Sequence, residues 1–155
     1  MFEWVDRGFL EPTEGETTDY EVIEEWLREV ASRFDLRSCA YDPYALMQFS
    51  QRARNEGLPM VEYRTTTLNF SERTKMLDAL MREGRLDHDG SPMALWCIGN
   101  VAGHYDRRGN VYPNKPRLEA KIDCAIADIM ALGVSLAADQ EPQYIYAGDK
   151  ELLVF

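Results

Sequence analysis

The sequence lacks an apolar run of the about 18 residues that a membrane-spanning helix requires. Its first residues, MFEWVDRGF, also lack the basic and apolar regions of a secretory signal. These absences predict a cytoplasmic protein with no membrane partner. Cysteine is scarce too, because only Cys39, Cys97 and Cys124 occur, widely spaced and without a CxxC pair. This pattern argues against a zinc knuckle or a disulfide framework and favours reduced core cysteines.

Basic residues are outnumbered by acidic ones, 17 against 27, which gives a net charge of −10. Such an excess of acid ordinarily argues against a nucleic-acid partner, because affinity for phosphates comes largely from Lys and Arg. The charge is uneven, however: residues 1–35 carry 11 acidic and 3 basic side chains, whereas residues 36–120 carry 10 and 12. The middle segment is therefore compatible with a local DNA-facing surface, and the acidic front is equally compatible with a solvated helix.

The chain of 155 residues, 45% of them apolar, is long enough for one ordinary domain with a single core. It contains no internal repeat and no low-complexity segment. We expect the domain to occupy residues 1–137 and a short extended tail to occupy residues 138–155.

Hydrophobic periodicity predicts alternating helices and strands in the first half of the chain. Residues 2–17 contain Gly and Pro with little periodicity, and we expect them to be extended. A helix, a strand, a helix, a strand and a helix are then predicted in that order, over residues 17–34, 36–42, 44–57, 59–64 and 71–84. The charged face of the first helix, which includes Glu24, is expected to be solvated. This alternation indicates an α/β domain.

The second half of the chain predicts two more helices and a hairpin. Pro92 is suited to the first position of a helix, and a turn at residues 108–110 predicts a hairpin. The segment LEAKIDCAIADIMALG carries Ile122, Ile126 and Ile129 at helical spacing. It therefore predicts an amphipathic helix over residues 120–133 that ends at a glycine.

Two acids have an unusual local context. Asp42 ends an apolar strand just before a helix, which is where open α/β sheets gather their ligands. Asp123 begins a helix that should pack on the same sheet. If both carboxylates face one cleft, their repulsion calls for a cation, and oxygen ligands suit Mg²⁺ or Mn²⁺. Asp123 alone is equally well explained as a first-turn carboxylate stabilised by the helix dipole.

The order of several motifs resembles the C-terminal nuclease domain of the large terminase subunit of tailed bacteriophages. The resemblance extends over roughly residues 2–135. The stretches that carry it are Trp4–Gly15, YDPY at 41–44, LDHDGSPMALWCIGN at 86–100, DRRGNVYPNKP at 106–116 and KIDCAIADIMALG at 121–133. YDPY alone is common, but the ordered set is more specific. The resemblance implies an RNase H-like fold and metal-dependent cutting of concatemeric phage DNA.

Carried over motif by motif, the resemblance implies that Asp42 and Asp123 are catalytic residues and ligands of Mg²⁺ or Mn²⁺. It also implies supporting positions at His88, Asp106 and Lys121. Structural roles account for the same three residues: a turn histidine, a hairpin-starting aspartate and a lysine that covers a sheet edge.

The sequence also departs from the family pattern. In the family an ATPase motor precedes the nuclease, and the nuclease opens with a strand hairpin that carries another essential aspartate. Neither feature is found in the sequence, which has no GxxxxGK[ST] P-loop. We therefore expect an RNase H-like domain without its N-terminal strands, from a split or truncated gene or an excised fragment.

Two functions follow from this pattern. The first is a metal-dependent endonuclease domain of a phage terminase large subunit, incomplete as an enzyme in this chain. The alternative is a catalytically inactive terminase-derived remnant that binds DNA or a packaging partner. The resemblance implies double-stranded DNA, the ATPase part of the large subunit, the small terminase subunit and the portal as partners. An exposed sheet edge further predicts a homodimer or a complex with the missing part.

Overall fold

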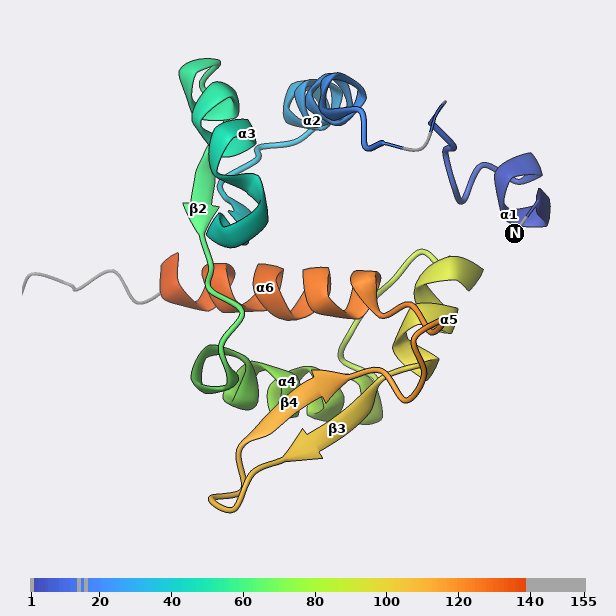
Figure 1. The fold of residues 1–155 in the computed structure, drawn as a ribbon, viewed down its shortest axis with the longest axis vertical. Helices are drawn as coiled ribbons and strands as arrows, with labels where there is room; N and C mark the ends of the chain where they lie inside the picture. Colours follow the sequence, from blue (N-terminus) through green and yellow to red (C-terminus); the bar gives the residue numbers. More distant parts are fainter. Residues whose placement is uncertain (1, 14, 16, 139–155) are drawn as a thin grey trace, which may run out of the picture.

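A computed structural model describes residues 2–13, 15 and 17–138. The helix α6 (Asp123–Ala138) runs through the centre, with elements on either side of it (Figure 1). On one side lie α2 (Tyr20–Arg33), β1 (Cys39–Tyr41), α3 (Pro43–Asn55) and β2 (Met60–Glu62). On the other side lie α4 (Thr67–Arg82), β3 (Ala102–Tyr105) and β4 (Val111–Asn114), with α5 (Pro92–Gly99) near the start of α6 and α1 (Phe2–Asp6) beyond it.

The strands β1 and β2 pair in parallel, with Cys39 opposite Met60. Since α3 connects them, the predicted order of helix, strand, helix, strand and helix is confirmed. Parallel strands bring their C-terminal ends to the same edge of a sheet. The predicted end of the first strand at Asp42 is also confirmed, because Asp42 is the N-cap of α3 and Pro43 lies in its first turn.

The predicted hairpin is confirmed as the antiparallel pair β3 and β4, with Tyr105 opposite Val111. Its turn includes Gly109, whose φ of 77° costs glycine no steric strain. β4 packs on α4, where Ser71 Oγ accepts a hydrogen bond from the Val111 N–H at 3.1 Å. The described residues thus form a mixed α/β structure with two separate two-stranded sheets, which is consistent with a truncated RNase H-like domain.

Two hydrophobic clusters stabilise the fold, one on each side of the centre. The first contains Leu27, Tyr41, Phe49, Ala53, Leu58 and Met60, from α2, β1, α3, β2 and the loop before β2. The second contains Phe70, Leu77, Ile129 and Met130, from α4 and α6. Tyr63 and Ala40 pack against this second cluster, so the parallel strands connect the two. The predicted apolar stripe of α6 is confirmed by the burial of Ile129.

Two segments near helix starts differ from the prediction. Residues 2–6 form the short helix α1 rather than extended chain, and Trp4 packs on Trp96 of α5 with 5.6 Å between ring centroids. The helix α4 begins at Thr67, four residues before the predicted Ser71. Thr66 causes this earlier start, because its Oγ1 accepts a hydrogen bond from the Asn69 N–H at 3.3 Å.

The helix α6 begins at Asp123 and continues past Gly133 to Ala138, so the predicted end at Gly133 is wrong. Gly133 is buried within the helix, and a Cβ at this position would overlap the ring of Tyr63. Glycine therefore serves close packing here rather than helix termination.

The predicted solvation of Glu24 is wrong as well, since this residue is only 6% exposed. Its carboxylate forms ion pairs with Arg28 at 3.6 Å and with Arg52 of α3 at 2.8 Å. The sequence of α2 suggests that this charged side faces solvent, but α3 covers it.

The cysteines of the described residues are free thiols, with Cys97 buried and Cys39 and Cys124 half-buried. Among residues 2–13, 15 and 17–138, no helix is long and apolar enough to span a bilayer. The predicted tail lies outside the described residues, except for Ala138, which ends α6.

Candidate functional site

Asp42 is held in a defined position at the C-terminal end of β1. Its Oδ1 accepts a hydrogen bond from the Tyr44 N–H at 3.0 Å, and its Oδ2 accepts one from Thr65 Oγ1 at 2.7 Å. The first bond caps α3, whereas the second ties the carboxylate to the chain just after β2. Both oxygens are therefore oriented by neighbours from two parallel strand ends.

Asp123 occupies the first position of α6 and is exposed. It lines a groove of about 820 Å³ together with Asp42 and Thr65, and Ile126 and Met130 contribute apolar parts of the lining. The structure thus places the two predicted acids in one groove between β1 and α6.

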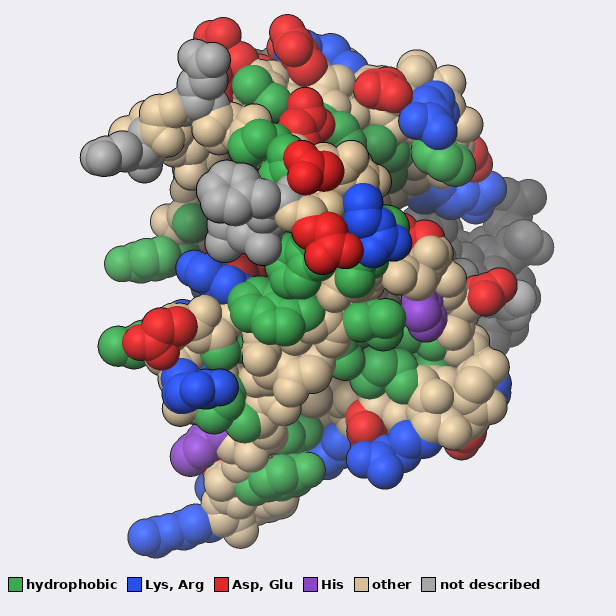
Figure 2. Space-filling view, turned by 90° about the vertical axis from the view of Figure 1, so that its right-hand side faces the viewer, with side chains coloured by type: hydrophobic (Ala, Val, Ile, Leu, Met, Phe, Trp, Pro, Cys, Tyr) green, Lys and Arg blue, Asp and Glu red, His purple; other side chains and the backbone are tan. Residues whose placement is uncertain are grey.

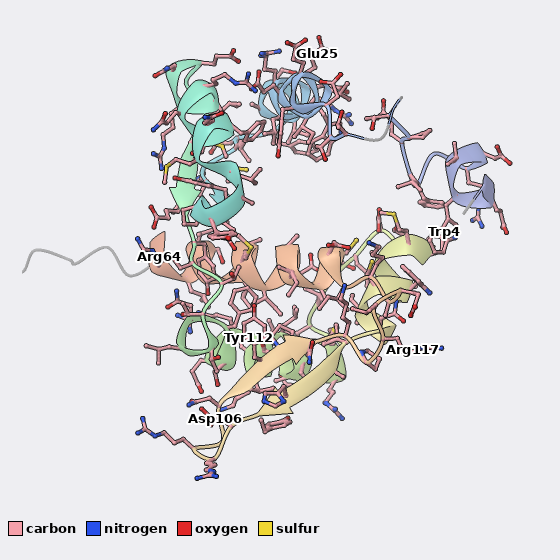
Figure 3. The ribbon with its side chains drawn as sticks, in the orientation of Figure 1. Trp4, Glu25, Arg64, Asp106, Tyr112 and Arg117 are labelled. Carbon is pink, nitrogen blue, oxygen red and sulfur yellow. The ribbon has the colours of Figure 1, made fainter. Side chains whose placement is uncertain are left out.

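The two acids lie toward different ends of this groove. Tyr41, which precedes Asp42, accepts a hydrogen bond from the N–H of Tyr63, and the Tyr63 ring lies against Gly133. Arg64, which follows Tyr63, lies beside the C-terminal half of α6, whereas Asp123 is the first residue at the N-terminal end of this helix (Figure 3). The described residues therefore bring the acids into one groove without placing them side by side.

The donor set fits a divalent metal in chemistry but is incomplete in number. Two carboxylates and a threonine hydroxyl are the oxygen donors that Mg²⁺ and Mn²⁺ favour. Within the described part of the chain, however, no group of three or more His, Cys, Asp or Glu side chains is arranged to hold a metal ion. These residues alone do not form a complete metal centre.

Neither His88 nor Lys121 lines the groove of the two acids, although Lys121 is only two residues before Asp123. His88 precedes α5, where its Nδ1 accepts a hydrogen bond from the Gly90 N–H at 2.9 Å, and it lines a different groove beside Asp128. Lys121 is exposed, and its carbonyl accepts a hydrogen bond from Asn100 Nδ2 at 3.0 Å. That bond links the end of α5 to the segment just before α6.

Asp106 organises the turn of the hairpin and does not line the groove of Asp42. Its Oδ1 accepts hydrogen bonds from the N–H groups of Arg108 at 2.8 Å and Asn110 at 2.9 Å, and its Oδ2 accepts one from Asn110 Nδ2 at 2.8 Å. The hydrogen bond from the Asn110 side chain, with those from the backbone, lowers the pKa of this carboxyl. Asp106 therefore remains ionised and stabilises the turn.

Thr65 is the site residue that sequence reasoning missed. It follows the second parallel strand, so its place at the same sheet edge as Asp42 is the signal that was present in the sequence. A threonine between two others in RTTT carries no distinctive pattern, and only the pairing of β1 with β2 singles it out.

The site thus consists of an α/β fold with one acid directly after a parallel strand and another at the start of a packed helix. Comparison with known proteins gives the family: the model of the terminase large subunit endonuclease domain matches residues 1–139. This chain belongs to that family.

Individual relatives agree with this assignment. The chain is 36% identical over 141 residues to "Protein YmfN" of Escherichia coli (strain K12), covering 89% of this chain and 31% of that protein. It is 31% identical over 134 residues to the large terminase subunit of Enterobacteria phage HK97, covering 85% and 27% of the two chains. The crystal structure of the HK97 large terminase matches with a TM-score of 0.78 at 30% identity, over 86% of this chain and 28% of that one. The chain thus spans less than a third of the relatives it matches.

Proposed function

We propose that this chain acts as the metal-dependent endonuclease domain of a phage terminase large subunit and cuts concatemeric DNA during genome packaging. In this proposal Asp42 and Asp123 are ligands of Mg²⁺ or Mn²⁺, and donors outside the described residues complete the site. The observation that carries the proposal is the orientation of Asp42 by Thr65 at a parallel strand end, in the groove that Asp123 also lines. A bound metal would activate water and stabilise the leaving oxygen of a phosphodiester.

The chain itself contributes positioning and access. The hydrogen bonds from Thr65 and Tyr44 fix the rotamer of Asp42, so a cation meets an already oriented carboxylate. Asp123 is exposed and remains open to a ligand. The proposed partners are double-stranded DNA, the ATPase part of the large subunit, the small subunit and the portal, in the host-cell cytoplasm.

The test is linearisation of supercoiled plasmid with Mg²⁺ or Mn²⁺, by this chain alone and with the N-terminal part of a terminase large subunit. We expect little or no cutting by the chain alone, because a two-metal reaction loses its geometry when ligands are missing. The added part should restore cutting, and Asp42→Asn or Asp123→Asn should abolish it with little loss of fold.

Asp128→Asn is the matched control, because Asp128 lies on the same helix but lines the other groove. Its substitution therefore tests whether the loss of any acid on α6 has the same effect. Equal activity of the Asp123→Asn variant and the unsubstituted chain would refute the ligand assignment. Calorimetric binding of Mn²⁺ without cutting in either mixture would favour the non-catalytic remnant instead.

A further inference from the structure

Basic side chains fall into two groups according to whether a carboxylate neutralises them. Nearly all basic residues before residue 100 form ion pairs, for example Arg28 with Glu56, Arg82 with Asp78 and Arg85 with Glu83. After residue 100 the described part of the chain shows no ion pair for any lysine or arginine. These residues form what we call the cationic strip, which consists of Arg107, Arg108, Lys115, Arg117 and Lys121.

The cationic strip follows the hairpin from its turn to its base and continues to α6. Asp106 marks the turn and Arg117 the opposite end (Figure 3). All five side chains are exposed. Asp106 directly precedes the strip and accepts hydrogen bonds from the N–H groups of Arg108 and Asn110, and Glu119 lies between Arg117 and Lys121. The strand β4 runs from Val111 to Asn114 and leads directly to Lys115, so this part of the strip spans about 13 Å as extended chain. Because duplex DNA carries one charge per roughly 1.7 Å of axis, this length faces several phosphates.

The strip is attached to rigid structure at both ends. Asp106 fixes the turn through three hydrogen bonds, and Val111 is buried and bonded to Ser71 of α4. At the base, Asn100 holds the carbonyl of Lys121. The backbone that presents these cations is therefore preorganised, which lowers the entropic cost of binding a ligand.

The charge of the whole molecule orients this surface. Acidic side chains crowd the upper part of one face, over α2, whereas basic side chains project at the lower end, level with the hairpin turn (Figure 2). An acidic end and a cationic end favour one approach direction for a polyanion.

We propose that the cationic strip binds the phosphate backbone of duplex DNA and leads it toward the Asp123 end of the groove. This inference rests on the proposed function for its choice of DNA as the polyanion. The turn residues Arg107 and Arg108 contact phosphates, and Asp106 is a positioning residue that sets their direction.

The experiment measures binding of a fluorescently labelled duplex by anisotropy at several salt concentrations, with EDTA present so that no cutting occurs. The double variant Arg107→Gln, Arg108→Gln should make the negative slope of log K against log salt less steep, by about 2. The matched control is Arg82→Gln, Arg85→Gln, which removes the same charge from ion-paired arginines and should leave the slope nearly unchanged. Equal losses in both double variants would overturn the proposal, since net charge alone would then explain binding.

A second variant tests positioning without relying on lost cations. Asp106→Ala removes a negative charge, so a pure net-charge effect predicts tighter binding. We expect at least a severalfold weaker affinity instead, because the turn loses the acceptor that orders it. Tighter or unchanged binding by a folded Asp106→Ala protein, checked by circular dichroism, would contradict the proposal.

Competition and cutting assays separate this inference from the proposed function. Polyglutamate of equal charge should compete poorly with the labelled duplex, and equal competition would show a surface without preference for DNA. Asp123→Asn should bind the duplex with an unchanged salt slope. If cutting is lost but binding still depends on the cationic strip, the strip is supported although the proposed function fails. If DNA is cut but binding does not depend on Arg107 and Arg108, the strip is refuted and the proposed function stands.

Discussion

The α2 and α3 helices and the β3–β4 hairpin use charged residues in opposite ways. On the α2 and α3 side, Arg28 bonds to Glu56 at 2.7 Å and Arg52 to Glu24 at 2.8 Å, so arginines connect one helix to the next. On the hairpin side, the described arginines and lysines after residue 100 have no carboxylate partner, and an aromatic cluster around Phe70 supplies the packing. Cations that are neutralised within the fold stabilise it, whereas cations without a carboxylate partner are available to a ligand.

The largest effect should come from the aromatic cluster. Phe70 is fully buried and packs on Tyr63 and Tyr112, with 5.9 and 5.3 Å between ring centroids. Phe70→Ala should lower the free energy of unfolding by about 3–5 kcal/mol. Phe49→Ala on the other side should cost about 1 kcal/mol less, because Phe49 has one aromatic neighbour, Tyr20. Urea unfolding measures both, and a larger loss for Phe49→Ala would reverse the comparison.

A smaller effect should follow from crowding the contact between α6 and the end of β2. Gly133→Leu should lower the free energy of unfolding by about 2–3 kcal/mol, because the new side chain displaces the Tyr63 ring. Gly99→Ala is the control, since a Cβ there meets open space within α5. It should leave stability unchanged or raise it by about 0.5 kcal/mol. Thermal unfolding of both variants decides, and a neutral Gly133→Leu would show that Tyr63 can leave its place freely.

The ion pairs between α2 and α3 should contribute less than either packing contact. Glu24→Gln removes the buried charge between Arg28 and Arg52 and should cost about 1 kcal/mol. Glu29→Gln, whose carboxylate pairs with Arg33 on the exposed surface, should cost less than about 0.5 kcal/mol. Chemical unfolding at low salt compares the two, and equal losses would mean that burial of Glu24 adds nothing.

The smallest effect is a dependence of stability on pH. The hydrogen bond from Arg28 lowers the pKa of Glu56 below its ordinary value of 4.5. A lowered carboxyl pKa contributes stability that is present above the unfolded pKa and is lost as pH falls through the folded pKa. Below about pH 4.5 the unsubstituted chain should therefore lose stability more steeply than Glu56→Gln. Parallel curves in the two unfolding series would contradict this linkage.

Local patterns predicted the elements that depend on neighbours in sequence. The strand before Asp42 and the hairpin turn at Gly109 were predicted correctly, and the start of α6 was predicted to within three residues, because capping, turn chemistry and periodicity act over a few residues. The motif order also predicted the family and the two acids that line one groove. The metal-binding role of these acids stays a prediction.

What the sequence by itself determined is the α/β class, the order of elements and the position of each acid at the end of an element. The tertiary structure alone decided which partners these elements meet. Thr65 reaches Asp42 across 23 residues, and Val111 bonds to Ser71 across 40. Likewise the burial of Glu24 and the continuation of α6 through Gly133 depend on Arg52 and Tyr63. Contacts between distant residues arise only when the helices and strands pack, so no local pattern encodes them.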